Sequence, residues 1–292
     1  MCAEHEVLVL APGTHDEDVP GAPRVLRCAG RGLFGPPGAL ARLRERPSRA
    51  LGGLEFCMRA RRWLEQDGPF DRVIAHWLLP CAWPIAAGVS CPLEAVAHGS
   101  DVRLLARLPL ALRKQITRQW LDREVSIRVM SNELRELLLA CTSQRLEHRV
   151  RVEPMQLEID PALERSAARR SLGVARSARL VLLVARLIPE KRVEAALRAV
   201  CLLPGVEVVV VGGGPLLPDL RQRFGAVRFL GELPRPRALA WIAAADVVVS
   251  ASLLEGAPTA LREARALGVP VVARAAGDLA ERAARDDGLW LV

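Results

Sequence analysis

Short apolar runs alternate with polar or glycine-rich segments between residues 179 and 273, and this alternation decides the fold class. The key portions are RLVLLVARLIPEKR (179–192), VEVVVVGGGP (206–215), VRFLGEL (227–233) and AADVVVSASLLEGAPTALREARALGVPVVA (244–273). Apolar runs of this length, separated by segments long enough to be helices, are typical of buried strands in a parallel sheet. We therefore predict an α/β fold in which polar groups collect where the strands end.

This second half predicts five strands that alternate with four helices. The strands are Leu180–Val184, Val206–Val211, Val227–Leu230, Val247–Ser250 and Val269–Ala273, and the helices are Val193–Leu202, Leu216–Phe224, Arg235–Ala244 and Thr259–Leu267. A further helix over Ala162–Leu172 is expected to end near Gly173. Such alternation indicates a doubly wound parallel sheet.

The first half alternates less regularly but has the same character. Its predicted strands are His5–Leu10, Val25–Cys28, Asp71–Ala75, Leu93–Ala97, Val125–Met130 and Val150–Val152. Helical segments are predicted over Ala39–Gln66 with breaks near Pro47 and Gly52-Gly53, over Trp83–Gly88, over Leu104–Arg123 with a split at Pro109, and from an N-cap at Ser131 to Cys141. The proline-bounded segment 154–161 separates two predicted domains, residues 1–157 and 158–292.

Composition indicates a globular protein and excludes several classes. Hydrophobic residues make up 51% and charged residues 25% of the 292 residues, and no apolar run approaches the ~18 residues that cross a bilayer. The N-terminus lacks the pattern of a signal peptide. We therefore expect a cytoplasmic location, which is compatible with peripheral contact at the inner membrane face. The seven cysteines show no CxxC pair, which favours buried free thiols over a metal site.

The positive charge is almost entirely arginine. The formal net charge is +8, and of 41 basic residues only Lys114 and Lys191 are lysines. A basic chain can bind nucleic acid, but no nucleic-acid-binding motif is present, and a phosphate-bearing small ligand needs only a few cations. The arginines among the leucines of Leu104–Leu121 fit a solvated helix face or contact with an anionic membrane.

Two glutamates, Glu255 and Glu263, flank a predicted helix start marked by Gly256 and Pro258. A helix N-terminus presents free N–H groups and a partial positive charge, which can hold a phosphate. Carboxylates beside such a site can accept hydrogen bonds from sugar or ribose hydroxyls. The alternative is an ordinary strand–loop–helix with two exposed glutamates.

Other candidate binding residues also follow strands. Arg186 and Lys191 can neutralise a diphosphate, or they are surface charges; the rarity of lysine here favours a function for Lys191. Gly212, Gly213, Gly214 and Pro215 form a turn that lets a ligand approach the backbone, but a dinucleotide fingerprint would need glycine where Leu217 stands. This disfavours an NAD-dependent enzyme.

Two histidines lie at strand ends in the first half. His98, followed by Gly99-Ser100-Asp101, can reach into a cleft and donate to a phosphate or a sugar hydroxyl; a structural histidine is the alternative. For His76, in His76-Trp77, a structural role or contact with an acceptor is expected.

Seven ordered segments together resemble glycosyltransferase family 4, a family of retaining enzymes with the GT-B fold. They are AHWLLP (75–80), HGSDV (98–102), ARLIPEKR (185–192), VGGGP (211–215), FLGEL (229–233), AADVVVSAS (244–252) and EGAPTALREARALGVPVVA (255–273). The resemblance implies two Rossmann-like domains with parallel sheets facing across a cleft. The C-terminal domain would bind a nucleotide-sugar and the N-terminal domain the acceptor.

The resemblance also implies a role for each matching residue, with no metal and no other cofactor. Arg186, Lys191 and the amides after Gly256 would bind the donor diphosphate. Glu255 would contact the donor sugar, and Glu263 would hold the ribose. The Gly212–Pro215 and Gly231-Glu232 turns would border the base, and His98 would lie near the anomeric centre. The expected function is transfer of a sugar to a glycan or lipid-linked acceptor in cell-surface polysaccharide or glycolipid assembly.

The departures from the family pattern define an alternative function. HEVLVLAP (5–12) resembles the second strand of the family's N-terminal domain, so that domain is expected to lack its first strand, and both ends of the chain look cut. Ala275-Ala276-Gly277 keeps one of two usual glycines, and Gln156-Leu157-Glu158 replaces a usual Gly-Val-Asp. The alternative is a truncated or inactive homologue that binds donor weakly or acts as a scaffold.

Overall fold

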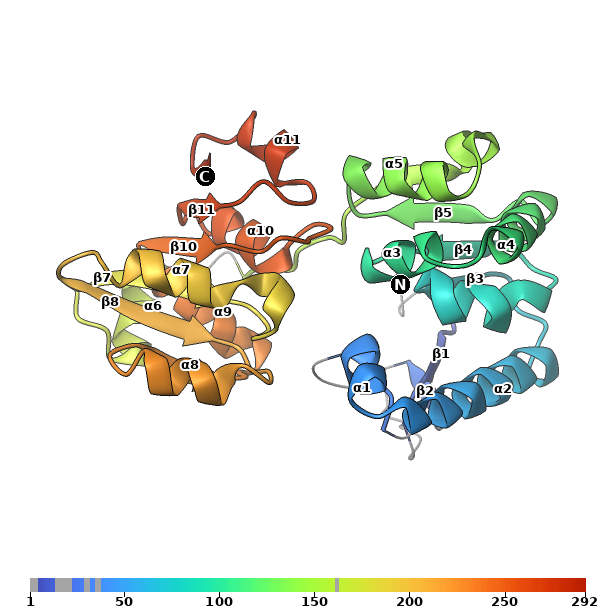
Figure 1. Cartoon of the computed structure of the whole chain (residues 1–292), viewed down its shortest axis with the longest axis horizontal. Helices are drawn as coiled ribbons and strands as arrows, with labels where there is room; N and C mark the ends of the chain where they lie inside the picture. The colour runs from blue at the N-terminus through green and yellow to red at the C-terminus, as the bar shows by residue number, and fades with distance from the viewer. Residues whose placement is uncertain (1–4, 14–22, 29–31, 35–37, 161–162) are drawn as a thin grey trace. The chain divides into compact units, whose positions relative to one another are not determined.

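A computed structural model describes residues 5–13, 23–28, 32–34, 38–160 and 163–292. The chain forms two compact units (Figure 1): unit 1 comprises Met1–Val129 and Arg135–Arg151, and unit 2 comprises Met130–Leu134 and Val152–Val292. Each unit combines parallel strands with helices, as the sequence predicted. The boundary predicted between residues 157 and 158 remains a proposal.

Unit 2 contains a sheet of six parallel strands in the order β12-β11-β10-β7-β8-β9. The strands are β7 (Arg179–Val184), β8 (Val206–Val211), β9 (Arg228–Gly231), β10 (Val247–Ser250), β11 (Val271–Ala273) and β12 (Leu289–Leu291). Five of them match predicted strands to within two residues at each end. Because all run in one direction, their C-terminal ends share one edge of the sheet, where polar loops follow β7, β8 and β10.

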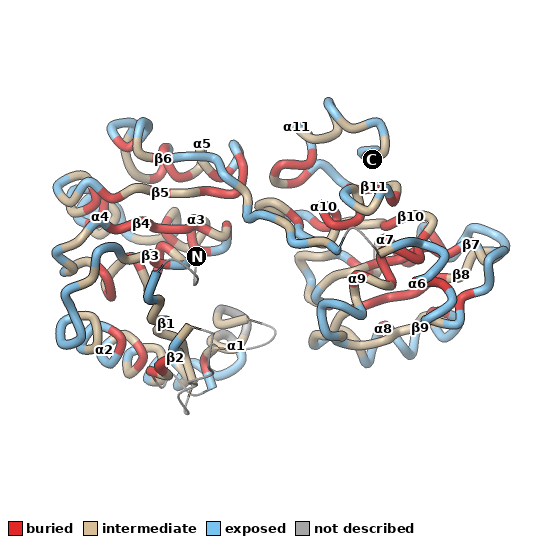
Figure 2. Tube along the Cα trace, turned by 180° about the vertical axis from the view of Figure 1, so that it is seen from behind, coloured by how far each residue is buried: buried red, intermediate tan, exposed pale blue. Residues whose placement is uncertain are grey.

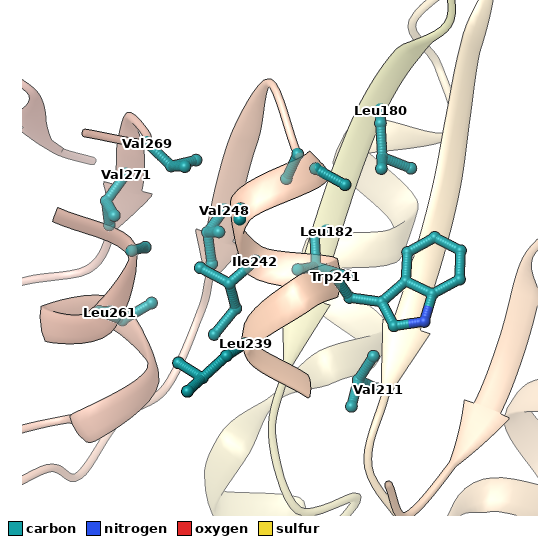
Figure 3. Packing of buried hydrophobic residues seen from close by; sticks show 14 of the residues in the cluster. Leu180, Leu182, Val211, Leu239, Trp241, Ile242, Val248, Leu261, Val269 and Val271 are labelled. Atoms are coloured by element: carbon teal, nitrogen blue, oxygen red, sulfur yellow. The ribbon is translucent and has the colours of Figure 1, made fainter. Parts of the chain in front are cut away.

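Helices cover both faces of this sheet (Figure 2). Alternate strand residues belong to two different core clusters, one on each face. The helices are α6 (Arg165–Leu172), α7 (Val193–Val200), α8 (Leu217–Arg223), α9 (Arg235–Ala244), α10 (Thr259–Ala266) and α11 (Leu279–Ala283). Leu180 and Leu182 pack with Trp241 and Ile242 of α9 (Figure 3), whereas Val181 and Leu183 join the other layer with α7 and α8. Burial on both faces explains the unbroken apolar runs.

Unit 1 contains a four-stranded sheet in the order β3-β4-β5-β6, in which β3, β4 and β5 are parallel, and a separate parallel pair, β1-β2. The strands are β1 (Leu8–Ala11), β2 (Arg24–Arg27), β3 (Val73–His76), β4 (Leu93–Val96), β5 (Ser126–Val129) and β6 (Val150–Val152). The main helices are α1 (Ala39–Glu45), α2 (Ala50–Gln66), α3 (Ser100–Ala106), α4 (Leu110–Asp122) and α5 (Asn132–Cys141). The split at Pro109 is confirmed, and the Ser131 hydroxyl caps α5 by accepting the Leu134 N–H at 3.3 Å.

The sheet of unit 1 is divided between β1 and β3. Within the described residues, β1 pairs only with β2, and β3 pairs only with β4. Val9 of β1 and Ile74 of β3 are both exposed, although strand residues of this type are usually covered. The expectation that this domain lacks its first strand stays a prediction.

Several local predictions are wrong. Gly52-Gly53 does not break the helix, because α2 runs through both glycines. The helix expected over Trp83–Gly88 is instead an irregular turn, η2 (Leu78–Ile85), with extended backbone at Leu79 and Trp83, followed by a 3₁₀ turn, η3 (Ala86–Gly88). The elements α11 and β12 were not predicted. The helix expected from Ala162 begins at Arg165 in the described part, and Ala162 itself lies outside the described residues.

Of the described cysteines, Cys28 and Cys141 are buried but Cys201 is exposed, so burial of every thiol was too broad an expectation; Cys2 lies outside the described residues. Within the described residues, none of the helices combines the length and the apolar character needed to cross a bilayer.

Candidate functional site

Lys191 and Glu255 meet at the C-terminal edge of the sheet in unit 2. Lys191 ends the short 3₁₀ turn η5 (Pro189–Lys191) after β7, and Glu255 lies in the loop after β10, which neighbours β7. The Lys191 ammonium donates to Glu255 Oε1 at 2.5 Å, and the two side chains are only 16% and 13% exposed. A second link fixes the two loops, since the Leu253 N–H donates to the Glu190 carbonyl at 3.0 Å.

The glycine turn after β8 is packed against the loop after β7. A side chain at position 212 would place its Cβ 1.9 Å from the Ala185 carbonyl oxygen, and one at position 214 would lie 2.5 Å from the Leu187 carbonyl oxygen. Both glycines have a positive φ, of 135° and 147°. The Leu187 N–H donates to the Gly213 carbonyl at 2.7 Å. Glycine is therefore required here by backbone packing, apart from any ligand.

The loop before α10 has a similar constraint. Gly277, with φ 62°, approaches so closely that a Cβ would lie 2.2 Å from the Gly256 carbonyl oxygen. The Asp278 N–H donates to the same oxygen at 2.9 Å. The N-cap of α10 is Pro258, whose side chain has no hydrogen-bond acceptor, and the first turn contains no acidic residue. The first N–H groups of α10 thus suit an anion.

Glu263 lies in α10 and has a partner that the sequence analysis missed. Its side chain is 8% exposed, and its Oε1 accepts from Arg235 of α9 at 3.1 Å. The Arg235 guanidinium also donates to the Glu158 carbonyl at 2.7 Å. The reading of Glu255 and Glu263 as two exposed glutamates is wrong, because both carboxylates are largely covered and paired. Arg235 carries no sequence signal that separates it from the many other arginines.

The remaining predicted residues of unit 2 line the same edge of the sheet. Arg186 follows β7 and is exposed. Gly231 ends β9 with φ 72°, and its carbonyl accepts the Gly212 N–H at 2.8 Å. Glu232 lies beside the glycine turn, because a Cβ on Gly213 would be 2.7 Å from its Cγ. Pro215 follows the turn and is exposed. The structure therefore gathers these residues with Lys191, while the roles assigned to them stay predictions.

His98 lies in unit 1, two residues beyond the end of β4, and its backbone is held by the buried carboxylate of Asp101. Asp101 is fully buried and accepts the N–H groups of His98 at 3.0 Å and Gly99 at 2.9 Å. Its second oxygen accepts the Leu78 N–H at 2.8 Å. Burial lowers the pKa of His98, and Asp101 opposes this effect. The sequence analysis quoted Asp101 within its motif but gave it no role.

The chemistry of these groups suits an anionic, hydroxyl-rich ligand. In unit 2, a lysine, an arginine and the N–H groups of a helix provide donors for phosphate oxygens. The ammonium of Lys191 has three donors and uses one on Glu255. The two carboxylates can accept from hydroxyls. The glycine turn does not complete the glycine pattern of dinucleotide-binding proteins, because Leu217 stands where the last glycine is needed.

The family model described as "Glycosyl transferases group 1" matches residues 178–292. Residues 178–292 are thus similar to a group 1 glycosyl transferase domain, and we call them the group 1 domain. The matched region begins just before β7, so it contains the whole sheet of unit 2 and every site residue assigned to that unit. The sequence-based resemblance to this class of enzyme is confirmed.

Two curated relatives each match part of the chain. The D-inositol 3-phosphate glycosyltransferase of Mycolicibacterium gilvum is 39% identical over 127 residues, which is 40% of this chain and 29% of the relative. TuaC of Bacillus subtilis, named as a teichuronic acid biosynthesis glycosyltransferase, is 29% identical over 209 residues, 69% of this chain and 52% of the relative. The matches thus span about half the relative's length or less.

Solved structures show the fold of the chain beyond the group 1 domain. Sucrose-phosphate synthase from Thermosynechococcus elongatus matches with a TM-score of 0.72 and 20% identity, covering 98% of this chain and 75% of that one. HepE of Anabaena, in complex with UDP-glucose, matches with a TM-score of 0.64 and 19% identity, covering 94% and 82%. The chain has the GT-B fold, as predicted.

Proposed function

We propose that this protein transfers a sugar, with retention of configuration, from a nucleotide-sugar to a glycan or lipid-linked acceptor. The observation that carries the proposal is the cluster at the C-terminal edge of the group 1 domain. There the Lys191–Glu255 pair, the glycine turn after β8 and the start of α10 lie together at the ends of three adjacent parallel strands. Such an edge is where ligands bind in open α/β sheets.

The donor would be bound through its charge and its hydroxyls. Lys191 and Arg186 neutralise the diphosphate, and the first N–H groups of α10 donate to its oxygens. Glu255 accepts from a hydroxyl of the donor sugar while Lys191 stays beside it. Glu263 accepts a hydrogen bond from a ribose hydroxyl. Arg235 donates to Oε1 of this carboxylate and so orients it. HepE, whose structure is titled as a complex with UDP-glucose, supports a nucleotide-sugar as the donor.

Transfer would be driven by charge stabilisation on the leaving group. As the bond between the anomeric carbon and the phosphate oxygen breaks, negative charge builds on the diphosphate, and the cations and N–H groups stabilise it. The leaving phosphate oxygen accepts the proton of the attacking hydroxyl on the same face of the sugar. No protein carboxylate is needed as a general base in this scheme, and no metal is used.

His98 and unit 1 would serve the acceptor side of the reaction. The backbone of His98 is held near a strand end by its hydrogen bond to Asp101, a placement suited to contact between its side chain and a substrate hydroxyl. TuaC is named for teichuronic acid biosynthesis, which supports assembly of a cell-surface polysaccharide or glycolipid. We place this reaction in the cytoplasm, at the inner membrane face when the acceptor is lipid-linked.

Thermal stabilisation by candidate donors tests the proposal. A ligand that binds the native state raises its stability by about 2.7 kcal/mol at a concentration of ~100 times Kd. We expect at least one of the UDP-, GDP- or ADP-sugars to raise the melting temperature, and the same donor to be consumed by hydrolysis or transfer. Failure of every donor to bind would contradict the proposal.

The divided sheet of unit 1 favours a second candidate, a homologue that binds donor without transferring it. In that case a nucleotide-sugar still stabilises unit 2, but no sugar is released or transferred with any acceptor fraction. Transfer by the purified chain would exclude this candidate. Binding of a nicotinamide dinucleotide in place of a nucleotide-sugar would exclude both.

A further inference from the structure

His76 and His98 form a hydrogen-bonded pair of imidazoles at the ends of two adjacent strands in unit 1. His76 is the last residue of β3, and His98 lies two residues beyond the end of β4. His76 Nδ1 is 3.1 Å from His98 Nε2. The ring centroids are 5.3 Å apart, with planes inclined by 27°. Among the described residues, no other hydrogen bond involves a ring nitrogen of His76 or His98.

One buried carboxylate holds both sides of the pair. Asp101 accepts the N–H of His98 and, through its other oxygen, the N–H of Leu78, two residues after His76. The backbone segments that carry the two rings are therefore anchored to the same side chain. A carboxylate that is fully buried and accepts three N–H groups has little freedom to move, so both rings start from fixed positions.

Trp77, between His76 and Leu78, has a backbone conformation that a bulky residue rarely adopts. Its φ is 82°, in the region that favours glycine. The Trp77 N–H donates to the Val96 carbonyl at 2.8 Å, and its carbonyl accepts the Ala82 N–H at 3.1 Å. Its indole lies 6.2 Å from the His98 ring. Residues in such conformations cluster at functional sites, where surrounding contacts maintain them.

Two facing imidazole nitrogens constrain each other's hydrogens. In a neutral imidazole one nitrogen donates and the other accepts. The pair forms a hydrogen bond only when one of the two facing nitrogens carries a hydrogen and the other does not, so the two tautomers are coupled and fixing that of His76 fixes that of His98. Partial loss of hydration lowers the pKa of both rings, and the charge of a protonated His98 lowers the pKa of His76 further. The neutral pair is thus the relevant form near pH 7.

We propose that His76 is a positioning residue for His98: it fixes the orientation of that ring and determines which of its nitrogens carries the hydrogen. The Nδ1 atom of His98 is then presented to a ligand in one defined state, as donor or as acceptor. The part of this proposal that concerns catalysis rests on the proposed function, because it assigns His98 to substrate contact. The pairing itself does not depend on that assignment.

Substitution of His76 by residues of matched shape tests the proposal. Asn and Leu are similar in size, but only Asn offers polar atoms near the position of Nδ1, so H76N preserves the hydrogen bond and H76L removes it. His76 is exposed, so neither change removes a core side chain. H148N and H148L serve as controls, because His148 is an exposed histidine of the same unit, in the 3₁₀ turn η4 (Gln144–Arg149).

Nitrogen NMR of the ¹⁵N-histidine-labelled full chain at pH 8 reports the tautomer of each ring. We expect His98 to show one protonated and one bare nitrogen in the wild type, in H76N and in both controls. In H76L the two nitrogens of His98 should move toward averaged shifts. Identical His98 signals in the wild type and in H76L would overturn the proposal.

Sugar transfer provides the second measurement. We expect H76L to lower kcat by roughly 10-fold with little change in KM, and H76N to recover most of the loss, because a misplaced group costs rate rather than ground-state binding. Equal losses in H76N and H76L would overturn the positioning role. If the wild type shows no transfer, the proposed function fails, but the nitrogen signals still decide whether His76 controls His98.

Discussion

At the scale of single residues, the Lys191–Glu255 pair couples two predicted roles that were assigned separately. Each side chain neutralises the other before any ligand binds, since they are 2.5 Å apart and largely covered. Removing one partner therefore leaves a partly buried charge without its counter-ion, which is more costly than losing a surface ion pair. Substitutions at either position must be interpreted as changes to the pair.

Lys191→Ala should weaken donor binding by more than the loss of one positive charge alone would. The carboxylate of Glu255 then faces the diphosphate without compensation, and we expect Kd to rise by at least roughly 10-fold, or about 1.4 kcal/mol. Adding Glu255→Gln should restore part of the affinity. Calorimetric titration with the donor found by the stability screen measures both effects.

Lys114→Ala is the matched control, because Lys114 is the other lysine of the chain and is exposed on α4. It should leave donor affinity unchanged. Equal weakening by Lys114→Ala and Lys191→Ala would show that general positive charge, and not the position of Lys191, determines binding. The inference drawn from the rarity of lysine would then be wrong.

Asp286 should make the stability of the group 1 domain depend on pH. Hydrogen bonds from Arg265 hold its pKa below the usual range, with contacts of 2.7 to 3.0 Å. A depressed folded-state pKa contributes stability above the unfolded pKa of about 3.9. That contribution is lost as the pH falls through the folded pKa, so it is present at pH 7 and absent in strong acid.

We expect Asp286→Asn to lower the free energy of unfolding at pH 7 by about 1 kcal/mol, a value reduced for the partial exposure of the pair. The difference from the wild type should shrink below about pH 4, where the unfolded-state carboxylate also protonates. Asp287→Asn removes the same charge from the exposed neighbour and should have little effect. A difference that stays constant from pH 7 to pH 3 would contradict the prediction. Urea unfolding across this range measures it.

The chemical types of the site residues could be predicted from the sequence, but their partners could not. Glu255, Lys191 and Gly212 follow apolar runs that mark strand ends, and parallel topology brings those ends together. Arg235 was missed because its contact with Glu263 links α9 to α10, and no local pattern marks it. The pairing of His76 with His98 likewise depends on the register of β3 against β4.

At the scale of elements, the glycine turn after β8 packs so closely against the loop after β7 that larger residues cannot replace its glycines. Gly212→Ala would place a Cβ 1.9 Å from a backbone oxygen at a φ of 135°. Neither the oxygen nor the φ can adapt cheaply, so we expect a loss of at least ~2 kcal/mol in unfolding free energy. A urea midpoint close to that of the wild type would contradict this packing.

Gly225→Ala is the control for this change. Gly225 precedes β9, and a Cβ there would meet no atom within 4 Å. Its substitution should be neutral or slightly stabilising, because alanine restricts the unfolded chain. Comparing the two variants separates the geometric requirement at position 212 from the general effect of replacing a glycine.

Elements with a regular apolar pattern were predictable, and those set by tertiary packing were not. The strands β7 and β8 are buried on both faces, and their unbroken apolar runs reveal them; shorter apolar runs mark β9, β10 and β11. The turn η2 is rich in apolar residues that also occur in helices, but it contains Pro80 and Pro84. Its backbone is fixed by tertiary contacts, such as the hydrogen bond from the Leu78 N–H to Asp101. Gly52-Gly53 stay helical, and Gly53 packs closely against Leu33.

At the scale of the whole molecule, the two units should respond differently to a donor. The residues proposed to bind it belong to unit 2, so its binding should suppress opening of that unit first. We expect hydrogen exchange of the amides after β7, β8 and β10 to slow by more than 10-fold at saturating donor. Amides of α4 in unit 1 should change much less.

The reverse pattern, with slowing confined to unit 1, would contradict the assignment of the donor to the group 1 domain. Equal slowing throughout the chain would instead indicate that the two units unfold as one cooperative block. The same data report on the edges of β1 and β3, whose outer N–H groups have no strand partner among the described residues and should exchange faster than those of β4.

The near absence of lysine also gives the protein a built-in pair of spectroscopic handles. Reductive ¹³C-methylation modifies side-chain amines, and this chain offers two, Lys114 in unit 1 and Lys191 in unit 2. Each unit would then contribute one dimethyl-lysine signal to a carbon spectrum, beside the signal of the α-amine, which the same reaction modifies. The signal from Lys191 arises from an amine within hydrogen-bonding distance of a carboxylate, so its chemical shift would follow occupancy of the sheet edge directly, with the signal from Lys114 as an internal reference.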